Sequence, residues 1–162
     1  MTVERYIIVD GYNVIYASDS LKEFMPNNKL RARESLAELI KAIHSIETVR
    51  VAVVFDSGNE RLEIEYPFGD KSFEFIFAPA SLTADGVIER ILVRAPKKDL
   101  ITVVSNDNLV REATRSNGAL AIRPNDLFDW VAVCNRRLID LTKSRDKTEQ
   151  KPFENRLDID LN

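Results

Sequence analysis

Short apolar runs that end on polar residues recur along the chain, and each has the length of a strand. They lie at residues 6–10, 49–55, 73–77, 100–104 and 119–122. Short runs that are apolar almost throughout are typical of parallel strands, which are buried on both faces. The intervening stretch at residues 59–69 is polar with weak alternation, which fits either a short hairpin or a loop.

Four segments between and after these runs show the three- and four-residue spacing of an amphipathic helix. They lie at residues 30–46, 83–94, 108–116 and 125–142. Thr83 is a natural N-cap for the second helix, and Asn117 with Gly118 forms a left-handed C-cap after the third. Strands that alternate with helices predict βαβ units, and therefore an α/β fold with helices on both faces of a mainly parallel sheet.

The predicted elements all fall within residues 1–142, without an internal repeat or an interdomain linker. Residues 143–162 are charged, low in apolar residues and balanced in sign. We therefore expect one domain over residues 1–142 and a charged C-terminal tail over residues 143–162, either mobile or packed as an arm.

Composition narrows the available chemistry. A single cysteine, Cys134, excludes an internal disulfide and a multi-cysteine zinc site, and we expect it to be a packed core thiol. The single histidine, His44, is expected to be structural, so an enzyme of this sequence would depend on carboxylates. The net charge of −3 argues against a basic surface over the whole protein, though not against a local one. No apolar run is long enough to span a bilayer and no signal peptide is apparent, so we expect a cytoplasmic location without a membrane partner.

Aspartates follow three of the predicted strands. Asp10 and Asp56 come directly after theirs, and Asp107 lies three residues after the run at 100–104. Asp85 lies in the first turn of the helix at 83–94, and Glu89 shares its face. Each residue alone is better explained as a turn former or a helix cap. Together at the carboxyl edge of a parallel sheet they favour a metal site, because clustered carboxylates repel one another unless a cation such as Mg²⁺ or Mn²⁺ is present.

Five segments resemble, in order and spacing, the motifs of the YacP-like NYN domain family, a branch of the PIN-like nucleases. They are V-D-G-Y-N-V-I at 9–15, R-A-R-E-S-L at 31–36, V-V-F-D-S at 53–57, T-A-D-G-V-I-E-R at 83–90 and V-S-N-D at 104–107. The resemblance covers roughly residues 5 to 140. It implies a PIN-like three-layer α/β/α sandwich and a metal-dependent endoribonuclease, with ribosome-associated mRNA cleavage as a plausible setting and RNA and the ribosome as partners.

The resemblance also assigns roles to particular residues. It implies that Asp10, Asp85 and Asp107 are catalytic and bind the metal, with Asp56 at the same edge. The family usually has a second acid after the one matched by Asp85, where this chain has Gly86. Glu89 is one turn along and is a possible replacement, so the chain is consistent with one metal or two.

Substrate contacts are expected from polar, basic and aromatic residues around these acids. The candidates are Asn13, Asn106, Arg33, Arg111 and Tyr12. The two amides would contact a metal ligand or the substrate, the arginines would contact phosphate, and Tyr12 would stack on a base. Arg33 is equally suited to an ion pair, Arg111 to a solvated helix face, and Tyr12 to local packing. Residues 18–28 have the turn chemistry of a loop that covers the cleft.

Other enzyme classes that begin from a strand-end aspartate fit poorly. A haloacid-dehalogenase-like phosphatase needs a second aspartate two residues after the first, where this chain has Tyr12. A response-regulator receiver needs an acidic pair after the first strand, and no G-x-G-x-x-G motif supports a dinucleotide site. The alternative that stays open is a catalytically weak RNA- or ribosome-binding module. The oligomeric state does not follow from the sequence.

Overall fold

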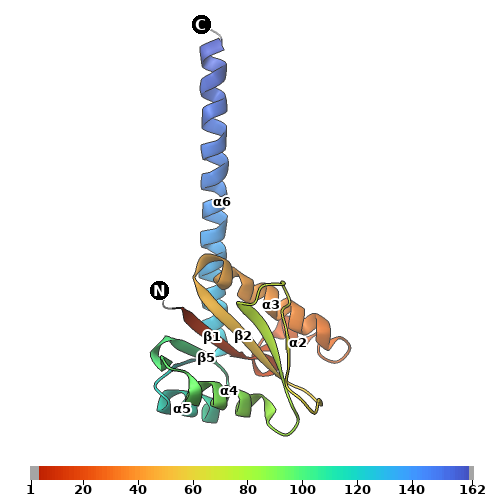
Figure 1. Ribbon diagram of the computed structural model, residues 1–162. Coiled ribbons are helices and arrows are strands. Elements are labelled where there is room, and N and C mark those ends of the chain that lie inside the picture. Colours follow the sequence, from red (N-terminus) through yellow and green to blue (C-terminus); the bar gives the residue numbers. More distant parts are fainter. Residues whose placement is uncertain (1–3, 161–162) are drawn as a thin grey trace.

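The computed structural model describes the backbone of residues 4–160 and the side chains of residues 4–146 (Figure 1). The strands are β1 Arg5–Asp10, β2 Val49–Asp56, β3 Glu63–Glu65, β4 Phe73–Ala78, β5 Ile101–Val104 and β6 Leu120–Ile122. The helices are α1 Gly11–Tyr16, α2 Asp19–Lys22, α3 Lys29–Ile46, α4 Thr83–Arg94, α5 Asn108–Ser116 and α6 Pro124–Asp160, with a 3₁₀ turn η1 at Lys98–Leu100.

The strands form one sheet in the order β3-β4-β2-β1-β5-β6, in which only β3 is antiparallel to its neighbour. From β1 the chain moves outward to β2 and β4, and then crosses back to β5 on the other side of β1. Open α/β sheets bind ligands beyond the carboxyl ends of the strands at such a reversal. Asp10 ends β1 there, since Val9 is paired with Val104 at the end of β5.

Alternate residues of the central strands supply two separate cores. Ile7 and Val9 of β1 belong to the core that α3 and α6 cover, whereas Ile8 belongs to the core under α4. Figure 1 shows α4 and α5 on one side of the sheet and α3 on the other. The predicted three-layer α/β/α sandwich with a mainly parallel sheet is therefore confirmed. Cys134 is buried in the core under α3 and α6, as expected of a packed thiol.

Three segments differ from the expectation or complete it. Gly11 begins α1 immediately after β1, in a segment for which no helix was predicted. The expected loop at residues 18–28 contains α2, and Met25 within it is buried in the core. The stretch at 59–69 holds the short strand β3, which pairs with β4.

The last helix extends beyond its predicted end. α6 continues to Asp160, so the backbone of residues 143–160 is helical. The division of the chain into residues 1–142 and a tail stays a prediction. Despite the length of α6, no helix in the described part of the chain combines the length and apolar character that crossing a membrane requires.

Candidate active site

Asp10 lies at the centre of a hydrogen-bonded cluster at the ends of β1 and β5. Its side chain is only 6% exposed, and its Oδ2 accepts a hydrogen bond of 2.9 Å from the hydroxyl of Ser105. Ser105 is fully buried, and its Oγ in turn accepts the backbone N–H of Asp107 at 3.1 Å. One hydroxyl therefore connects Asp10 and Asp107, two of the acids that the family resemblance assigns to the metal.

The charges of the predicted acids converge on Asp10. Burial raises its pKa to about 6, the bond from Ser105 opposes that rise, and the charges of Asp85, Asp56 and Asp107 add to it. The pKa of Asp85 is also raised, first by burial and then by Asp107 and Asp56. The structure thus brings four of the predicted carboxylates together electrostatically.

Glu89 is the predicted acid that stands apart from this group. It is exposed on α4, one turn after Asp85, and its charge is not among those that raise the pKa of Asp10 or Asp85. Gly86 lies between the two acids. A Cβ atom added at Gly86 would come within 2.8 Å of Cδ1 of Leu82, the flexible end of a half-buried side chain.

Asp56 and Asp107 also act as helix caps. Asp56 Oδ1 accepts the backbone N–H of Ala84 at 2.7 Å, at the start of α4. Asp107 is the N-cap of α5, and its Oδ1 accepts N–H groups of Leu109 at 2.8 Å and Val110 at 3.4 Å. Both aspartates therefore have the capping role that the sequence offered as the alternative to metal binding. Each uses one carboxylate oxygen for its cap, and among the described residues the other oxygen accepts no hydrogen bond.

The first turn of α4 has an unusual backbone. Its N-cap position falls on Leu82, one residue earlier than predicted, and Thr83 has a φ of 68°. A left-handed conformation is rare for a β-branched residue and strains the backbone. The side chain of Thr83 still accepts the N–H of Gly86 at 3.4 Å. This turn directs the N–H of Ala84 to Asp56 and puts Asp85 at the acidic edge.

The G-Y-N segment after β1 is tightly packed against the rest of the site. Asn13 Oδ1 accepts the backbone N–H of Asn106 at 2.6 Å, which joins α1 to the loop after β5. Gly11 lies directly against Phe55, since an added Cβ would be 2.3 Å from Cε1 of that ring. Asn13 and Asn106 therefore help to set the position of the loop that carries Asp107.

Arg111 lies beneath the same loop. It is 4% exposed, and its Nη1 donates to the carbonyl oxygen of Ser105 at 3.1 Å, while Nη2 donates to Asn108 Oδ1. The guanidinium is thus buried and used to hold the loop, instead of lying on a solvated helix face. Its predicted contact with phosphate has no geometric support here and stays a prediction.

Arg33 and Tyr12 line a cavity of about 600 Å³ beside Asp56. Arg33 Nη1 donates to the hydroxyl of Tyr12 at 3.0 Å, and its guanidinium lies 5.2 Å from the ring centroid of Phe77. Among the described residues Arg33 forms no ion pair, and its buried Nε has no hydrogen-bond partner. Lys29 lies 6.0 Å from the ring of Tyr12, so two cations and an aromatic ring border the acidic edge.

The donor set suits a hard divalent cation on chemical grounds, because it consists of carboxylate oxygens whose mutual repulsion a cation would relieve. Within the described residues, however, no three Asp, Glu, His or Cys side chains are placed to hold one ion. The capping bonds of Asp56 and Asp107 tie one oxygen of each to a helix N-terminus and leave the other oxygen of each for a ligand.

Ser105 is the residue of this site that sequence reasoning overlooked. Its signal is a polar side chain that directly follows the apolar run at 101–104, where a fully buried hydroxyl needs a partner. The bond between Asp56 and Ala84 has no such signal, because it joins residues 28 positions apart.

Comparisons with known proteins agree with this architecture. The sequence model of the YacP-like NYN domain matches residues 7–161. Protein YacP of Bacillus subtilis (strain 168) is 30% identical over 151 residues, which span 90% of this chain and 85% of YacP. A crystal structure of Rae1 (YacP) from Bacillus subtilis, in a tryptophan-to-leucine variant, is similar with a TM-score of 0.73 and 28% identity, covering 88% of this chain and 84% of Rae1. A second Rae1 (YacP) crystal structure has a TM-score of 0.71 and 29% identity over 94% of this chain and 84% of that one.

Proposed function

The chain belongs to the YacP-like NYN domain family, within the PIN-like nuclease superfamily, and from that premise we propose that it is a metal-dependent endoribonuclease that cleaves single-stranded RNA. The observation that carries the proposal is the gathering of Asp56, Asp85 and Asp107 around the buried Asp10, whose pKa burial and these three carboxylates raise to about 6. Such repulsion adds no stability to the fold, so a cluster of this kind favours a functional role.

In this proposal Asp10, Asp85 and Asp107 hold Mg²⁺ or Mn²⁺, with Asp56 at the same edge. When bound, the ion would lower the pKa of a coordinated water and offset charge on the phosphate. Ser105 holds the carboxylate of Asp10 in one orientation, and the cap at α5 does the same for Asp107. Because Gly86 stands where the family usually has a second acid, and Glu89 lies apart from the other carboxylates, a site with a single ion is the simpler expectation.

Arg33 and Tyr12 are proposed to bind the RNA in the cavity beside Asp56. The Nε–H of Arg33 is left for an acceptor, and the ring of Tyr12 offers a stacking face, although in this structure it is tilted against Phe55 at 4.9 Å between centroids. Asn13 and Asn106 set the loop that borders the other side of the acids. This arrangement supports recognition of a strand with its bases exposed.

The test is cleavage of a 5′-labelled single-stranded RNA in Mg²⁺ or Mn²⁺ by the wild type, Asp10→Asn, Asp107→Asn and the control Asp129→Asn, an exposed acid on α6. We expect internal cuts that EDTA abolishes. Both site variants should lose more than about 100-fold in rate, beyond the 10–100-fold cost of losing an outer-shell partner, while the control keeps its rate. Full activity in Asp10→Asn would overturn the proposed site.

The alternative function is an RNA- or ribosome-binding module with weak or no catalysis. It predicts RNA binding in a filter or anisotropy assay without cleavage in either ion. Absence of both binding and cleavage contradicts the nuclease and the module alike.

Ribosome-associated mRNA is the proposed cellular substrate. The same protein added to a cell-free translation reaction should cleave a translated mRNA faster than the same mRNA with initiation blocked. Equal rates in the two reactions would remove the ribosome from the proposal and leave the nuclease activity intact.

A further inference from the structure

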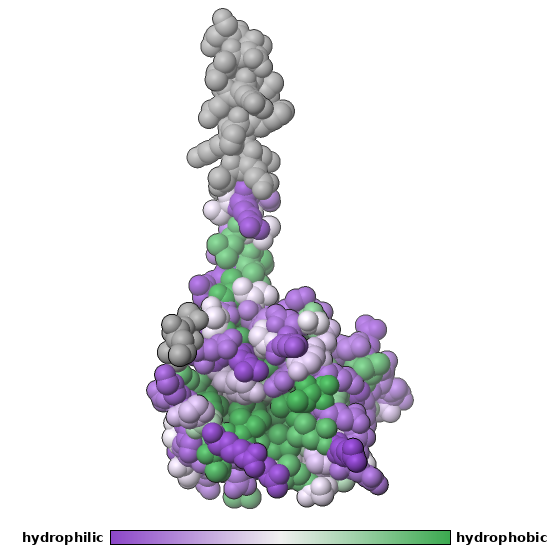
Figure 2. Space-filling model, viewed as in Figure 1, coloured by the Kyte–Doolittle hydropathy of each residue, from purple (hydrophilic) through white to green (hydrophobic). Residues whose placement is uncertain are grey.

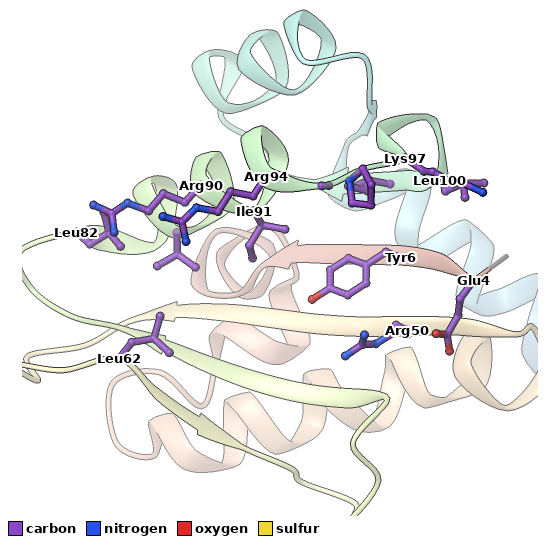
Figure 3. A pocket seen from close by; sticks show the side chains of 14 residues that line it. Glu4, Tyr6, Arg50, Leu62, Leu82, Arg90, Ile91, Arg94, Lys97 and Leu100 are labelled. Carbon is purple, nitrogen blue, oxygen red and sulfur yellow. The ribbon is translucent and has the colours of Figure 1, made fainter.

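A groove distinct from the acidic edge lies between α4 and the sheet (Figure 3). Its volume is about 750 Å³, in the range of ligand pockets. Its apolar lining comes from several elements and consists mainly of Tyr6, Leu62, Leu82, Val87, Ile91 and Ile101. None of these residues belongs to the proposed nuclease site.

Cations border this groove, while the carboxylate of Glu74 lies close by and accepts a hydrogen bond of 3.2 Å from the hydroxyl of Tyr6. Arg90 and Arg94 lie along α4, Lys97 follows it, and Arg50 extends from β2 with its guanidinium 5.6 Å from the ring of Tyr6. The one acid in the lining is Glu4. Across the described residues none of the four cations forms an ion pair.

The spacing of two of these cations is unfavourable for the isolated helix. Arg90 and Arg94 are four residues apart on α4, where like charges repel. Figure 3 shows both side chains along the groove, with Ile91 beside Arg94 and pointing toward the strands. An acidic group bound over the groove would relieve this repulsion.

The apolar surface continues beyond the groove along β3. Leu62, Ile64 and Tyr66 alternate along this edge strand and are 44%, 46% and 42% exposed. Ile64 is paired with Ile76, which belongs to the core under α4, so these side chains lie on the same face as the groove. Figure 2 shows an apolar area bordered by hydrophilic residues where α4 meets the strands. An exposed apolar area with a polar border is typical of a protein contact.

These features define the occupant as a peptide segment that combines apolar and acidic side chains. The C-terminal end of the chain carries such a segment, F-E-N-R-L-D-I-D-L at residues 153–161, with four apolar residues and three acids to one arginine. An RNA strand would match the cations but would leave the apolar floor and the side chains of β3 without a matching partner.

The position of α6 indicates which copy of the chain supplies the segment. α6 has 37 residues, a length of about 55 Å, and Figure 1 shows it projecting away from the sheet. Its far end is therefore remote from the groove of its own domain. We propose that the groove between α4 and the sheet binds residues 153–161 of a second copy of this chain.

The first test uses a fluorescein-labelled peptide of residues 150–162 and the full-length protein, with binding followed by anisotropy at low salt. We expect saturable binding that weakens at least 10-fold in the double variant Arg90→Glu/Arg94→Glu. The matched control Arg136→Glu/Arg137→Glu changes the net charge equally on an exposed part of α6 and should bind as the wild type does. A peptide carrying Asp158→Lys and Asp160→Lys should lose affinity for the wild type and regain it for the Arg90→Glu/Arg94→Glu protein.

The second test asks whether the contact forms between full-length chains. In sedimentation velocity the wild type should show concentration-dependent association. The Arg90→Glu/Arg94→Glu protein and the Asp158→Lys/Asp160→Lys protein should each associate at least 10-fold more weakly, and an equimolar mixture of the two should regain association. Circular dichroism confirms that both variants are folded.

Several outcomes overturn the proposal. A wild type that is monomeric at all concentrations and does not bind the peptide removes the contact. If Arg90→Glu/Arg94→Glu and the control Arg136→Glu/Arg137→Glu weaken peptide binding equally, the binding is non-specific charge attraction. A concentration-independent expansion of the Arg90→Glu/Arg94→Glu protein places the segment in its own groove. Loss of single-stranded RNA binding with unchanged peptide binding assigns the groove to RNA.

Discussion

Asp10 shows how one buried side chain links stability to chemistry in this protein. Its carboxylate is 6% exposed, held by Ser105, and surrounded by the charges of Asp85, Asp56 and Asp107. Removing an ionised carboxylate from water and placing it near like charges is unfavourable. The native state therefore holds a proton on Asp10 at pH values where the unfolded chain has lost it.

Asp10→Asn should stabilise the metal-free protein at neutral pH. The folded pKa of about 6 exceeds the ordinary value of 3.8. The stability that the wild type gains from protonated Asp10 is therefore fully present below pH 3.8 and is lost as the pH rises through 6. From pH 4 to pH 7 the free energy of unfolding of the variant should gain up to about 3 kcal/mol on the wild type. Urea unfolding in EDTA measures this gain, and Asp129→Asn serves as the control. A pH-independent difference would contradict the raised pKa.

Gly11→Ala should destabilise the protein, because a Cβ there would meet the ring of Phe55 at 2.3 Å. That ring is fully buried and packs on Phe75 at 5.2 Å and Phe77 at 5.8 Å between centroids, so it has little room to move. Overpacking of this kind costs about 1–3 kcal/mol. Gly58→Ala is the matched control, since nothing lies within 4 Å of its added Cβ. Equal urea midpoints for the two variants would show that the core at Phe55 can yield.

At the scale of elements, the acids are tied to the starts of two helices. Asp56 accepts an N–H at the start of α4, and Asp107 caps α5. Carboxylates at helix N-termini are also stabilised by the helix dipole. The same side chains therefore fix the helices and provide charge at the acidic edge, so capping and metal binding are compatible roles.

Substitutions of Asp107 separate these two roles. Asn caps a helix about as well as Asp, so Asp107→Asn should change the free energy of unfolding by less than about 0.5 kcal/mol, whereas Asp107→Ala should cost about 1 kcal/mol. RNA cleavage should be lost in both, because neither supplies a charged ligand. Urea unfolding and the cleavage assay, run in parallel, provide the test. If the Asp107→Asn protein still cleaves RNA, Asp107 serves only as a helix cap.

At the scale of the whole molecule, the strand order decides where chemistry can occur. β1 lies between β2 and β5, so the loops that follow these three strands meet at one edge of the sheet. The start of α4 reaches the same edge from the side opposite α3. The groove lies on the face of the sheet that α4 covers, away from the edge where the acids gather. Substrate cleavage and self-association are thus proposed for separate surfaces.

A divalent ion bound at the proposed site should stabilise the folded protein by mass action, because only the native state assembles that site. At a Mn²⁺ concentration 100-fold above the Kd the gain is about 2.7 kcal/mol, or about 5–10 °C in Tm for a chain of this size. Thermal unfolding with and without Mn²⁺ should show this shift in the wild type and not in Asp10→Asn. An equal shift in both proteins would place the ion elsewhere.

Local sequence patterns determined most of the elements. The largely apolar runs of β1, β2 and β5 are recognisable without any neighbour, because burial on both faces leaves few polar positions in them. The left-handed Gly118 after α5 follows equally from local chemistry, and its φ of 86° agrees. The resemblance of the motifs to a known family then predicted that these elements form an α/β/α sandwich.

Only the tertiary structure decided how the site is held. The bonds of Ser105 to Asp10 and of Asn106 to Asn13 join residues 95 and 93 positions apart, and the strand order that brings them together has no local signal. The cap from Asp56 to Ala84 and the burial of Arg111 likewise depend on how α4 and α5 pack. Sequence patterns report what one segment prefers, whereas a site at a sheet edge is made by segments that meet only after folding.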